Sequence, residues 1–487
     1  MIVFIKKKKT SNWALMLLLS VPFLYSCASY NKVKSDYYQS IRVGNYEKAS
    51  SVITKSRFFK KKRNKLLYNL ENGRLQFLAN NYTKSNAYLN AADDILESNF
   101  KTGKDVAIGN LVNPMMETYR GEEFEKLLIY FYKALNYAAL NKIEDAVVEA
   151  RRISLASDRL NQKVKNKTGK YNNDAFALNF QGMLYEMSGD INNAFISYRN
   201  AADIFLNKNN NYYGVQIPEQ LKLDVIRTAD QLGFGNEKEK YETLFNNQTD
   251  STHPDRELIL FLEEGNAPVK EETSFSIVYA NGRATYQFVD QNGIYHTEPF
   301  DYSGNGISGS KLSDFRTIKI ALPTYRIVYP RSSKIMVECN QRQYHPEITQ
   351  DLNTLSLSIL QERFLSDLSK AVIRFLVKHT VEKGSNKLAT SITENHKKNS
   401  SDSESEKKKK EENAKIVGDA VGFLVGLSNT MTEIADTRCW TSLPAYIHYV
   451  RIPLEEGVNQ INIHFKGKEK TIQLEAKKGV ELKCVTL

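Results

Sequence analysis

Glycine and histidine residues are the first candidates for chemistry in this sequence. Gly304, Gly306 and Gly309 have the spacing of a dinucleotide-binding loop. That loop needs a strand before it and a helix at its third glycine, whereas the flanking sequence here is typical of a turn among antiparallel strands. The seven histidines lack metal-ligand spacing, and neither HExxH nor GxSxG occurs. We therefore expect a protein without enzymatic activity, a cofactor or a metal site.

Cys27 carries the clearest chemical signal in the chain. A basic run at residues 6–9 precedes an apolar run at residues 14–25, and the small residue Ser26 stands just before the cysteine. This order is typical of a secretory signal. A cysteine directly after the cleavage point is the residue whose thiol accepts diacylglycerol in bacterial lipoproteins. The pattern predicts a signal peptide over residues 1–26 and a mature chain lipidated on Cys27.

Two alternatives to a lipoprotein signal remain open. An uncleaved membrane anchor is disfavoured because the apolar run is about twelve residues long, against the roughly 20 that a spanning helix requires. A plain secretory signal with a chance cysteine is the other alternative, and Tyr25 is bulkier than the usual lipobox residue. Ala28, in place of an inner-membrane-retaining Asp, favours the outer membrane. No acidic run follows Cys27 to support export to the cell surface, so we expect the protein to face the periplasm.

Composition narrows the class of protein further. The chain has 487 residues, of which 41% are hydrophobic, which is enough for folded domains. Its formal net charge of +11 includes four lysines of the predicted signal, so the excess in the mature chain is a weak argument for a nucleic-acid partner. Cys339, Cys439 and Cys484 form no CxxC motif, and we expect them to be small buried side chains.

Helical repeats are expected over residues 35–245, after a lipid-anchored linker at residues 27–34. Gly182, Tyr185, Ala194 and Tyr198 have the spacing of a tetratricopeptide (TPR) repeat, in which a glycine and an alanine let two antiparallel helices approach closely. Weaker copies occur at residues 134–150, 73–92 and 44–53. The pattern predicts a TPR-like α-solenoid, and a generic helical bundle is the alternative.

The second half is expected to mix strands and helices. A mixed domain over residues 246–390 contains a predicted hairpin turn at Asn281-Gly282 and a helix at residues 352–377. Its predicted strands lie at residues 257–262, 275–279, 284–289, 316–328 and 332–338.

Two further segments complete the predicted organisation. Residues 391–415 have the composition of a disordered charged insertion. Residues 416–487 predict a glycine-rich helix at 416–427, followed by a small antiparallel β module. Its strands are expected at residues 445–451, 459–465, 471–474 and 480–485. The predicted fold class is therefore α+β and multidomain, with an N-terminal α-solenoid, a mixed α/β region and a C-terminal antiparallel β module.

Several spaced motifs resemble those of a family of uncharacterised bacterial TPR-like lipoproteins. They are LENGRL at 70–75, YRGEEFE at 119–125, ALNY at 134–137, VEARR at 148–152 and ADTRCWTSLP at 435–444. The resemblance implies an envelope lipoprotein with helical repeats and a C-terminal β-rich part, and it implies no particular substrate.

Glu149, Arg151 and Arg152 are the candidate partner-binding residues. They would project from the second helix of a repeat, where they could hold a partner peptide, although a surface salt bridge between Glu149 and Arg152 is the simpler interpretation. We expect an outer-membrane lipoprotein that binds envelope proteins through its repeats. The alternative function is regulation or activation of enzymes that build the cell wall or the outer membrane.

Overall fold

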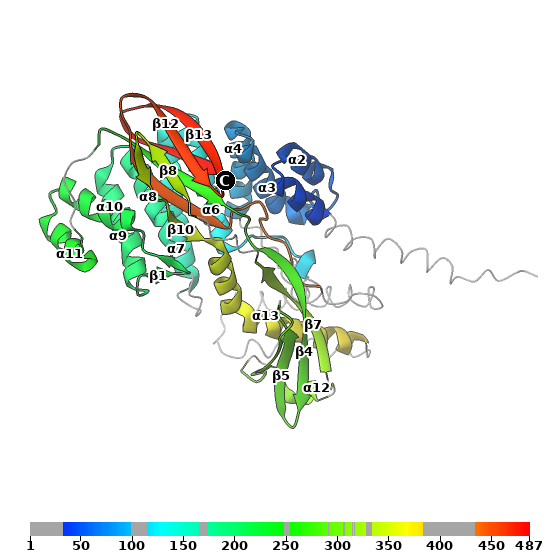
Figure 1. Cartoon of the computed structure of the whole chain (residues 1–487). Coiled ribbons are helices and arrows are strands. Elements are labelled where there is room, and N and C mark those ends of the chain that lie inside the picture. The colour runs from blue at the N-terminus through cyan, green and yellow to red at the C-terminus, as the bar shows by residue number, and fades with distance from the viewer. Residues whose placement is uncertain are drawn as a thin grey trace, which may run out of the picture.

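The computed structural model describes residues 33–98, 114–164, 173–247, 254–290, 292–304, 307–313, 315, 317–327, 334–382 and 434–487. Cys27, the predicted insertion at 391–415 and the predicted glycine-rich helix at 416–427 lie outside the described residues. The described chain is an α+β protein, as the sequence predicts. Figure 1 shows a body of helices and sheets from which a smaller β lobe projects.

Helices dominate the first half of the chain. After a helix at residues 33–42 they are α2 (Tyr46–Lys55), η1 (Lys62–Asn64), α3 (Lys65–Leu78), α4 (Tyr82–Glu97), η2 (Pro114–Met116), α6 (Glu123–Ala139), α7 (Ile143–Val164), α8 (Ala175–Met187), α9 (Ile191–Leu206), α10 (Glu219–Gln231) and α11 (Gly235–Phe245). The expectation of an all-helical region was wrong at one place, because β1 (Asn211–Tyr212) and β2 (Val215–Gln216) form a short antiparallel hairpin.

Successive helices pack against each other, and small residues set how closely they approach. On α8, a Cβ atom added at Gly182 would lie 2.4 Å from the ring of Tyr198 on α9. Ala194 and Tyr198 are fully buried at this contact, which confirms the close approach predicted there. Asp190 fixes the start of α9, since its carboxylate accepts a hydrogen bond from the Asn193 amide at 3.1 Å. The assignment of these helices to a TPR solenoid stays a prediction.

The body contains a central sheet with the strand order β10-β11-β3-β14. Its strands are β3 (Arg256–Glu264), β10 (Glu347–Asp351), β11 (Tyr446–Pro453) and β14 (Gly479–Thr486). Ile259 and Phe261 of β3 belong to the hydrophobic core of the helices. Leu258 and Leu260, on the opposite face, pack against a second sheet. Because both faces of β3 are covered, the strand is a nearly continuous apolar run.

The second sheet has the order β13-β12-β8-β9 and completes three layers of helices, sheet and sheet. Its strands are β8 (Met336–Cys339), β9 (Arg342–Tyr344), β12 (Gly457–Phe465) and β13 (Lys468–Ala476).

The C-terminal strands exist where predicted, but the expected small antiparallel sheet was wrong. β11 pairs antiparallel with one edge of β3, and β14 pairs parallel with the other. A buried strand needs hydrogen-bond partners at both edges, and β3 obtains both from the end of the chain. β12 and β13 do form an antiparallel hairpin, although in the second sheet beside β8.

The projecting lobe is a sheet of order β6-β5-β4-β7, and the long helix α13, described below, packs on it. It consists of β4 (Val269–Ala280), β5 (Arg283–Val289), β6 (Tyr295–Pro299), α12 (Gly309–Leu312) and β7 (Thr317–Arg326). Asn281 and Gly282 both have positive φ, at 53° and 75°, which confirms the predicted tight turn between β4 and β5.

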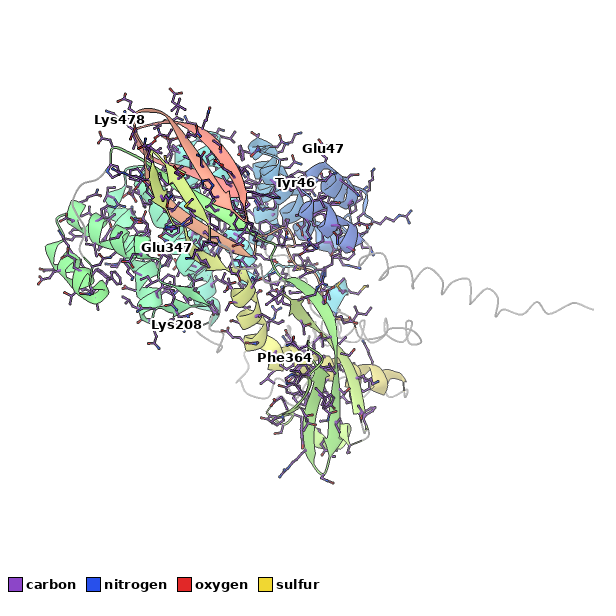
Figure 2. The ribbon with its side chains drawn as sticks, in the orientation of Figure 1. Tyr46, Glu47, Lys208, Glu347, Phe364 and Lys478 are labelled. Carbon is purple, nitrogen blue, oxygen red and sulfur yellow. The ribbon has the colours of Figure 1, made fainter. Side chains whose placement is uncertain are left out.

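Helix α13 (Leu352–Glu382) joins the lobe to the body. Its first turns, with Leu352 and Leu355, are buried in the core of the body. Its later turns, with Leu368 and Val372, are buried in the lobe. Phe364 lies where the helix crosses the lobe (Figure 2), with its ring centroid 5.3 Å from that of Phe275. The lobe therefore has its own core, and one continuous helix connects it to the body.

Candidate functional site

A buried strap, residues 434–445, runs through the body without forming a helix or a strand. Buried carboxylates accept the hydrogen bonds of its backbone amides. Glu125 of α6 accepts from the Trp440 amide at 2.8 Å, and Glu71 of α3 accepts from the Thr441 amide at 2.7 Å. Because buried amides need partners, these two glutamates hold the buried strap in place.

The strap brings together three of the motifs that carry the lipoprotein resemblance. Residues 70–75 supply Glu71, residues 119–125 supply Glu125, and residues 435–444 are most of the strap. The sequence alone did not predict that these motifs converge. A signal was present, since Glu71 and Glu125 each stand among apolar residues that are buried in the same helix.

Glu71 has an unusual electrostatic environment. Burial raises its pKa to about 7, against the lowering effect of hydrogen bonds from Ser442, Tyr37 and the Thr441 amide. The Tyr37 hydroxyl donates to this carboxylate at 2.5 Å, and the Ser442 hydroxyl donates at 2.6 Å. Through its hydrogen bonds from Thr441 and Ser442, the Glu71 carboxyl anchors the strap.

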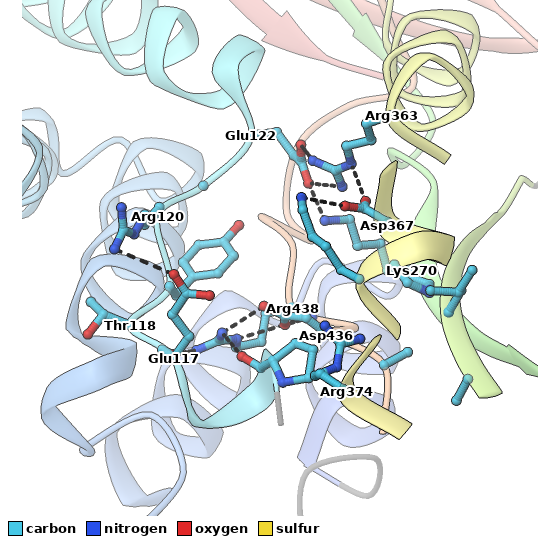
Figure 3. Close-up of a pocket in the computed structure, with 18 residues that line it drawn as sticks. Glu117, Thr118, Arg120, Glu122, Lys270, Arg363, Asp367, Arg374, Asp436 and Arg438 are labelled. Atoms are coloured by element: carbon cyan, nitrogen blue, oxygen red, sulfur yellow. Dashed lines mark hydrogen bonds and ion pairs between the residues drawn. The ribbon is translucent and has the colours of Figure 1, made fainter. Parts of the chain in front are cut away.

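Next to the strap lies the junction cavity, a space of about 250 Å³ between body and lobe (Figure 3). The residues that line it come from the η2–α6 connection, β4, β7, α13 and the buried strap. They are Pro114, Glu117, Thr118, Tyr119, Arg120, Gly121, Glu122, Lys270, Ala321, Leu322, Pro323, Arg363, Asp367, Lys370, Arg374, Ala435, Asp436 and Arg438. Pockets are commonly found at such meeting points of two structural units.

Glu122 links the body to the lobe on one wall of the junction cavity. Both terminal nitrogens of Arg363, on α13, donate to its carboxylate at 2.7 and 3.0 Å, and Lys270 of β4 forms a further ion pair with it (Figure 3). Burial would raise the pKa of Glu122, but Lys270 and Arg363 outweigh that effect and hold the pKa well below its ordinary value. A fork of this kind is a geometry suited to carboxylate and phosphate.

Arg438 of the strap forms the opposite wall. It is almost fully buried, and its guanidinium donates to the side chain of Asn64 at 2.9 Å and to the carbonyl of Glu117 at 2.9 Å. A further bond at 3.1 Å reaches the carbonyl of Pro114. Arg438 therefore fixes the η2–α6 connection against the strap.

A second space, the helical cavity, lies among α4, α6 and α7 and has a volume of about 320 Å³. The residues lining it include two of the three predicted partner-binding residues, Glu149 and Arg152. The full set is Asn90, Asp93, Asp94, Lys133, Tyr137, Asp145, Val148, Glu149 and Arg152.

The expected exposure of Glu149 was wrong, as was the expected salt bridge with Arg152. Glu149 is buried, and its carboxylate pairs at 3.0 Å with Lys133 of α6. Burial raises the pKa of Glu149, against the neighbouring charge of Lys133. Arg152 instead pairs with Asp93 of α4, because the helix face that carries it turns toward α4. Arg151 is exposed on α7.

Apart from these two cavities, a cluster of charged side chains is buried between the helices and the central sheet. Arg451 of β11 donates to Glu186 at 2.7 Å and to Asp224 at 3.1 Å, and it also pairs with Glu257 of β3. Arg227 of α10 lies in the same cluster, 2.8 Å from Glu186. These residues line neither the junction cavity nor the helical cavity, and the cluster joins the helical layer to the central sheet.

The described part of the chain holds neither a metal-binding cluster nor a helix that could span a membrane. There, no group of three or more His, Cys, Asp or Glu side chains is placed to hold a metal ion. No described helix combines the length and the apolar character that crossing a membrane requires. Cys339, Cys439 and Cys484 are free thiols, and the first two are buried, as expected.

No protein-family model, curated protein or solved structure matches this chain. The resemblance to TPR-like lipoproteins therefore stays a prediction.

Proposed function

We propose that this protein is an outer-membrane lipoprotein, anchored through Cys27, that acts as a periplasmic binding scaffold. In this proposal the helices form a TPR-like array that presents one face to another envelope protein. The observation that carries it is the outward face of α7. Val148 and Leu155 are 43% and 56% exposed on this helix. Residues seven apart lie on one helical face, so these two apolar side chains form a single stripe.

The charges around this stripe indicate which kind of partner segment would bind there. Arg151 is exposed beside the two apolar side chains, and the helical cavity opens next to Val148. Asp94 and Asp145 line that cavity and are exposed, and its acidic residues outnumber its basic ones by four to two. A partner segment with two apolar anchors and a basic side chain is complementary to this surface.

Capture of the partner by the full membrane-anchored chain tests the proposal. We expect Val148→Glu/Leu155→Glu to abolish capture in a mild-detergent pull-down, because each substitution places a charge where an apolar contact forms. Val43→Glu/Leu244→Glu is the matched control, since both residues are exposed apolar side chains of the helical region, away from α7. The control should retain capture.

Equal capture by both double variants would show that the α7 face does not bind the partner. Mass spectrometry of the captured protein would then distinguish scaffolding from the alternative function. A cell-wall or outer-membrane biogenesis enzyme whose rate rises on adding the purified protein would indicate activation.

A further inference from the structure

The junction cavity has a wall charge that differs from that of the helical cavity. Among the described residues that line it, six are cationic and four are acidic. The cationic residues are Arg120, Lys270, Arg363, Lys370, Arg374 and Arg438, and the acidic residues are Glu117, Glu122, Asp367 and Asp436. The wall therefore carries two formal positive charges.

One face of helix α13 lines the junction cavity. Arg363, Asp367, Lys370 and Arg374 recur at spacings of four, three and four residues, so they lie in one row along the helix. Asp367 is shared within the row, since it lies 3.3 Å from the Arg363 Nε atom and 3.3 Å from the Lys370 Nζ atom. One carboxylate thus pairs with two cations of this helix, and Arg374 adds a third cation to the row.

The opposite wall also carries cations, but Arg120 and Arg438 there are matched by Glu117 and Asp436, so the excess positive charge lies on α13 and β4. Arg120 is partly exposed there and pairs with Glu117 at 3.4 Å. Burial raises the pKa of Glu117, against the lowering effect of Arg120 and Arg438. This shift disfavours the ionised form of one of the four acids.

The Glu122 fork shows which chemistry this wall accommodates. Arg363 and Lys270 already hold one carboxylate with two nitrogens of a guanidinium and one ammonium. Arginine forks match carboxylate and phosphate oxygens alike. The cavity volume of about 250 Å³ lies just below the roughly 300–1,000 Å³ of pockets for drug-sized ligands, which suits a compact charged group.

We propose that the junction cavity binds a doubly charged oxyanion, namely a phosphate monoester group, between α13 and the η2–α6 connection. At neutral pH such a group carries a charge of about −1.5 to −2, which balances the two positive charges of the wall. Free phosphate compounds and the headgroup of a phosphatidic-acid type lipid share this chemistry. Bound there, the anion would contact both body and lobe and stabilise their relative position.

Calorimetric titration of the full chain in non-ionic detergent at low salt tests the proposal. The two probes are inorganic phosphate and dihexanoyl phosphatidic acid, a soluble short-chain lipid. We expect saturable binding that weakens as sodium chloride is added, because salt screens partly exposed charges. Tighter binding of phosphate would indicate a water-soluble source, and tighter binding of the lipid would indicate a headgroup.

Lys370→Glu is the decisive variant. It neutralises the net charge of the wall, and Lys370 is 53% exposed and paired at 3.3 Å with Asp367, so the fold should tolerate the change. We expect affinity to fall at least about tenfold. The matched control is Lys240→Glu on α11, where the lysine is 51% exposed and lies 3.3 Å from Glu237. That variant carries the same overall charge and should bind normally.

A second variant samples the opposite wall. Arg120→Gln should weaken binding in the same direction, since Arg120 comes from the η2–α6 connection. Circular dichroism confirms that each variant is folded. The proposal would be overturned by an absence of saturable binding of both probes, or by equal affinities in Lys370→Glu and Lys240→Glu. None of these results depends on capture of a protein partner by α7.

Discussion

Glu122 links the body and the lobe, and its replacement by Gln gives a quantitative test of this connection. The substitution keeps the shape of the side chain and removes its charge. Lys270 is then left buried without its counter-charge, whereas Arg363 is partly exposed and keeps Asp367 at 3.3 Å. Removing one partner of a buried ion pair costs about 3–5 kcal/mol. We expect a loss in this range near neutral pH, with most of it arising at Lys270.

The loss should depend on pH in a defined direction. The folded-state pKa of Glu122 lies well below its ordinary value of 4.5. Its ionised form therefore contributes full stability above that value, and the contribution falls as acidification continues toward the folded-state pKa. Each pH unit below the ordinary value removes up to about 1.4 kcal/mol. At about pH 3.5, the difference between wild type and Glu122→Gln should be smaller by about that amount.

Urea denaturation, followed by tryptophan fluorescence, measures both effects. Of the two tryptophans, Trp13 lies in the predicted signal peptide, so Trp440, beside Glu125 in the buried strap, is the reporter in the mature chain. With a slope of about 3 kcal/mol per molar urea, the midpoint should fall by about 1–1.7 M. Glu123→Gln is the control, because Glu123 pairs with Lys126 in a partly exposed position and should change stability by less than about 1 kcal/mol.

Two results would refute the role assigned to Glu122. One is a Glu122→Gln midpoint that matches the Glu123→Gln control near neutral pH. The other is an equal difference from wild type at neutral and acid pH.

Four other substitutions test separate parts of the molecule. Gly182→Ala should lose about 1–3 kcal/mol in urea denaturation, since the new Cβ would lie 2.4 Å from the buried Tyr198 ring. Gly235→Ala on α11 meets no atom within 4 Å and should be neutral or stabilising by up to about 1 kcal/mol. Arg451→Met should cost about 3–5 kcal/mol, because three buried carboxylates lose a shared cation; a smaller loss, measured by the urea midpoint, would argue against a structural role. Cys27→Ala should abolish incorporation of labelled palmitate, and labelling that persists would exclude Cys27 as the attachment site.

Local features of this fold were predictable from sequence because they depend on neighbouring residues. The Asn281-Gly282 turn needs only two residues that accept positive φ. The contact of Gly182 with Tyr198 follows from repeat spacing within one helical hairpin. The apolar run of β3 indicates a buried strand. In each case, the residues of one short segment are enough to predict the feature.

The pairing of distant segments could not be predicted. Periodicity identified β14 as a strand, but it does not identify β3 as the parallel partner. Helical spacing placed Glu149 near Arg152, yet it does not show that Glu149 would turn inward to Lys133. The junction cavity was missed for the same reason, since its wall combines residues from the helical half, the lobe and the strap.

The late position of the buried strap has a consequence for how the chain assembles. Glu71 and Glu125 occur early in the sequence, and the strap amides that satisfy them follow 370 and 315 residues later. β11 and β14 likewise cover the edges of β3 only after residues 446–486 have been added. As the chain folds, Glu71 and Glu125 therefore lack their hydrogen bonds from the strap until this segment docks. Burial of the strap acts as a closing step, so a chain interrupted before residue 434 cannot complete its core and remains open to chaperones and proteases.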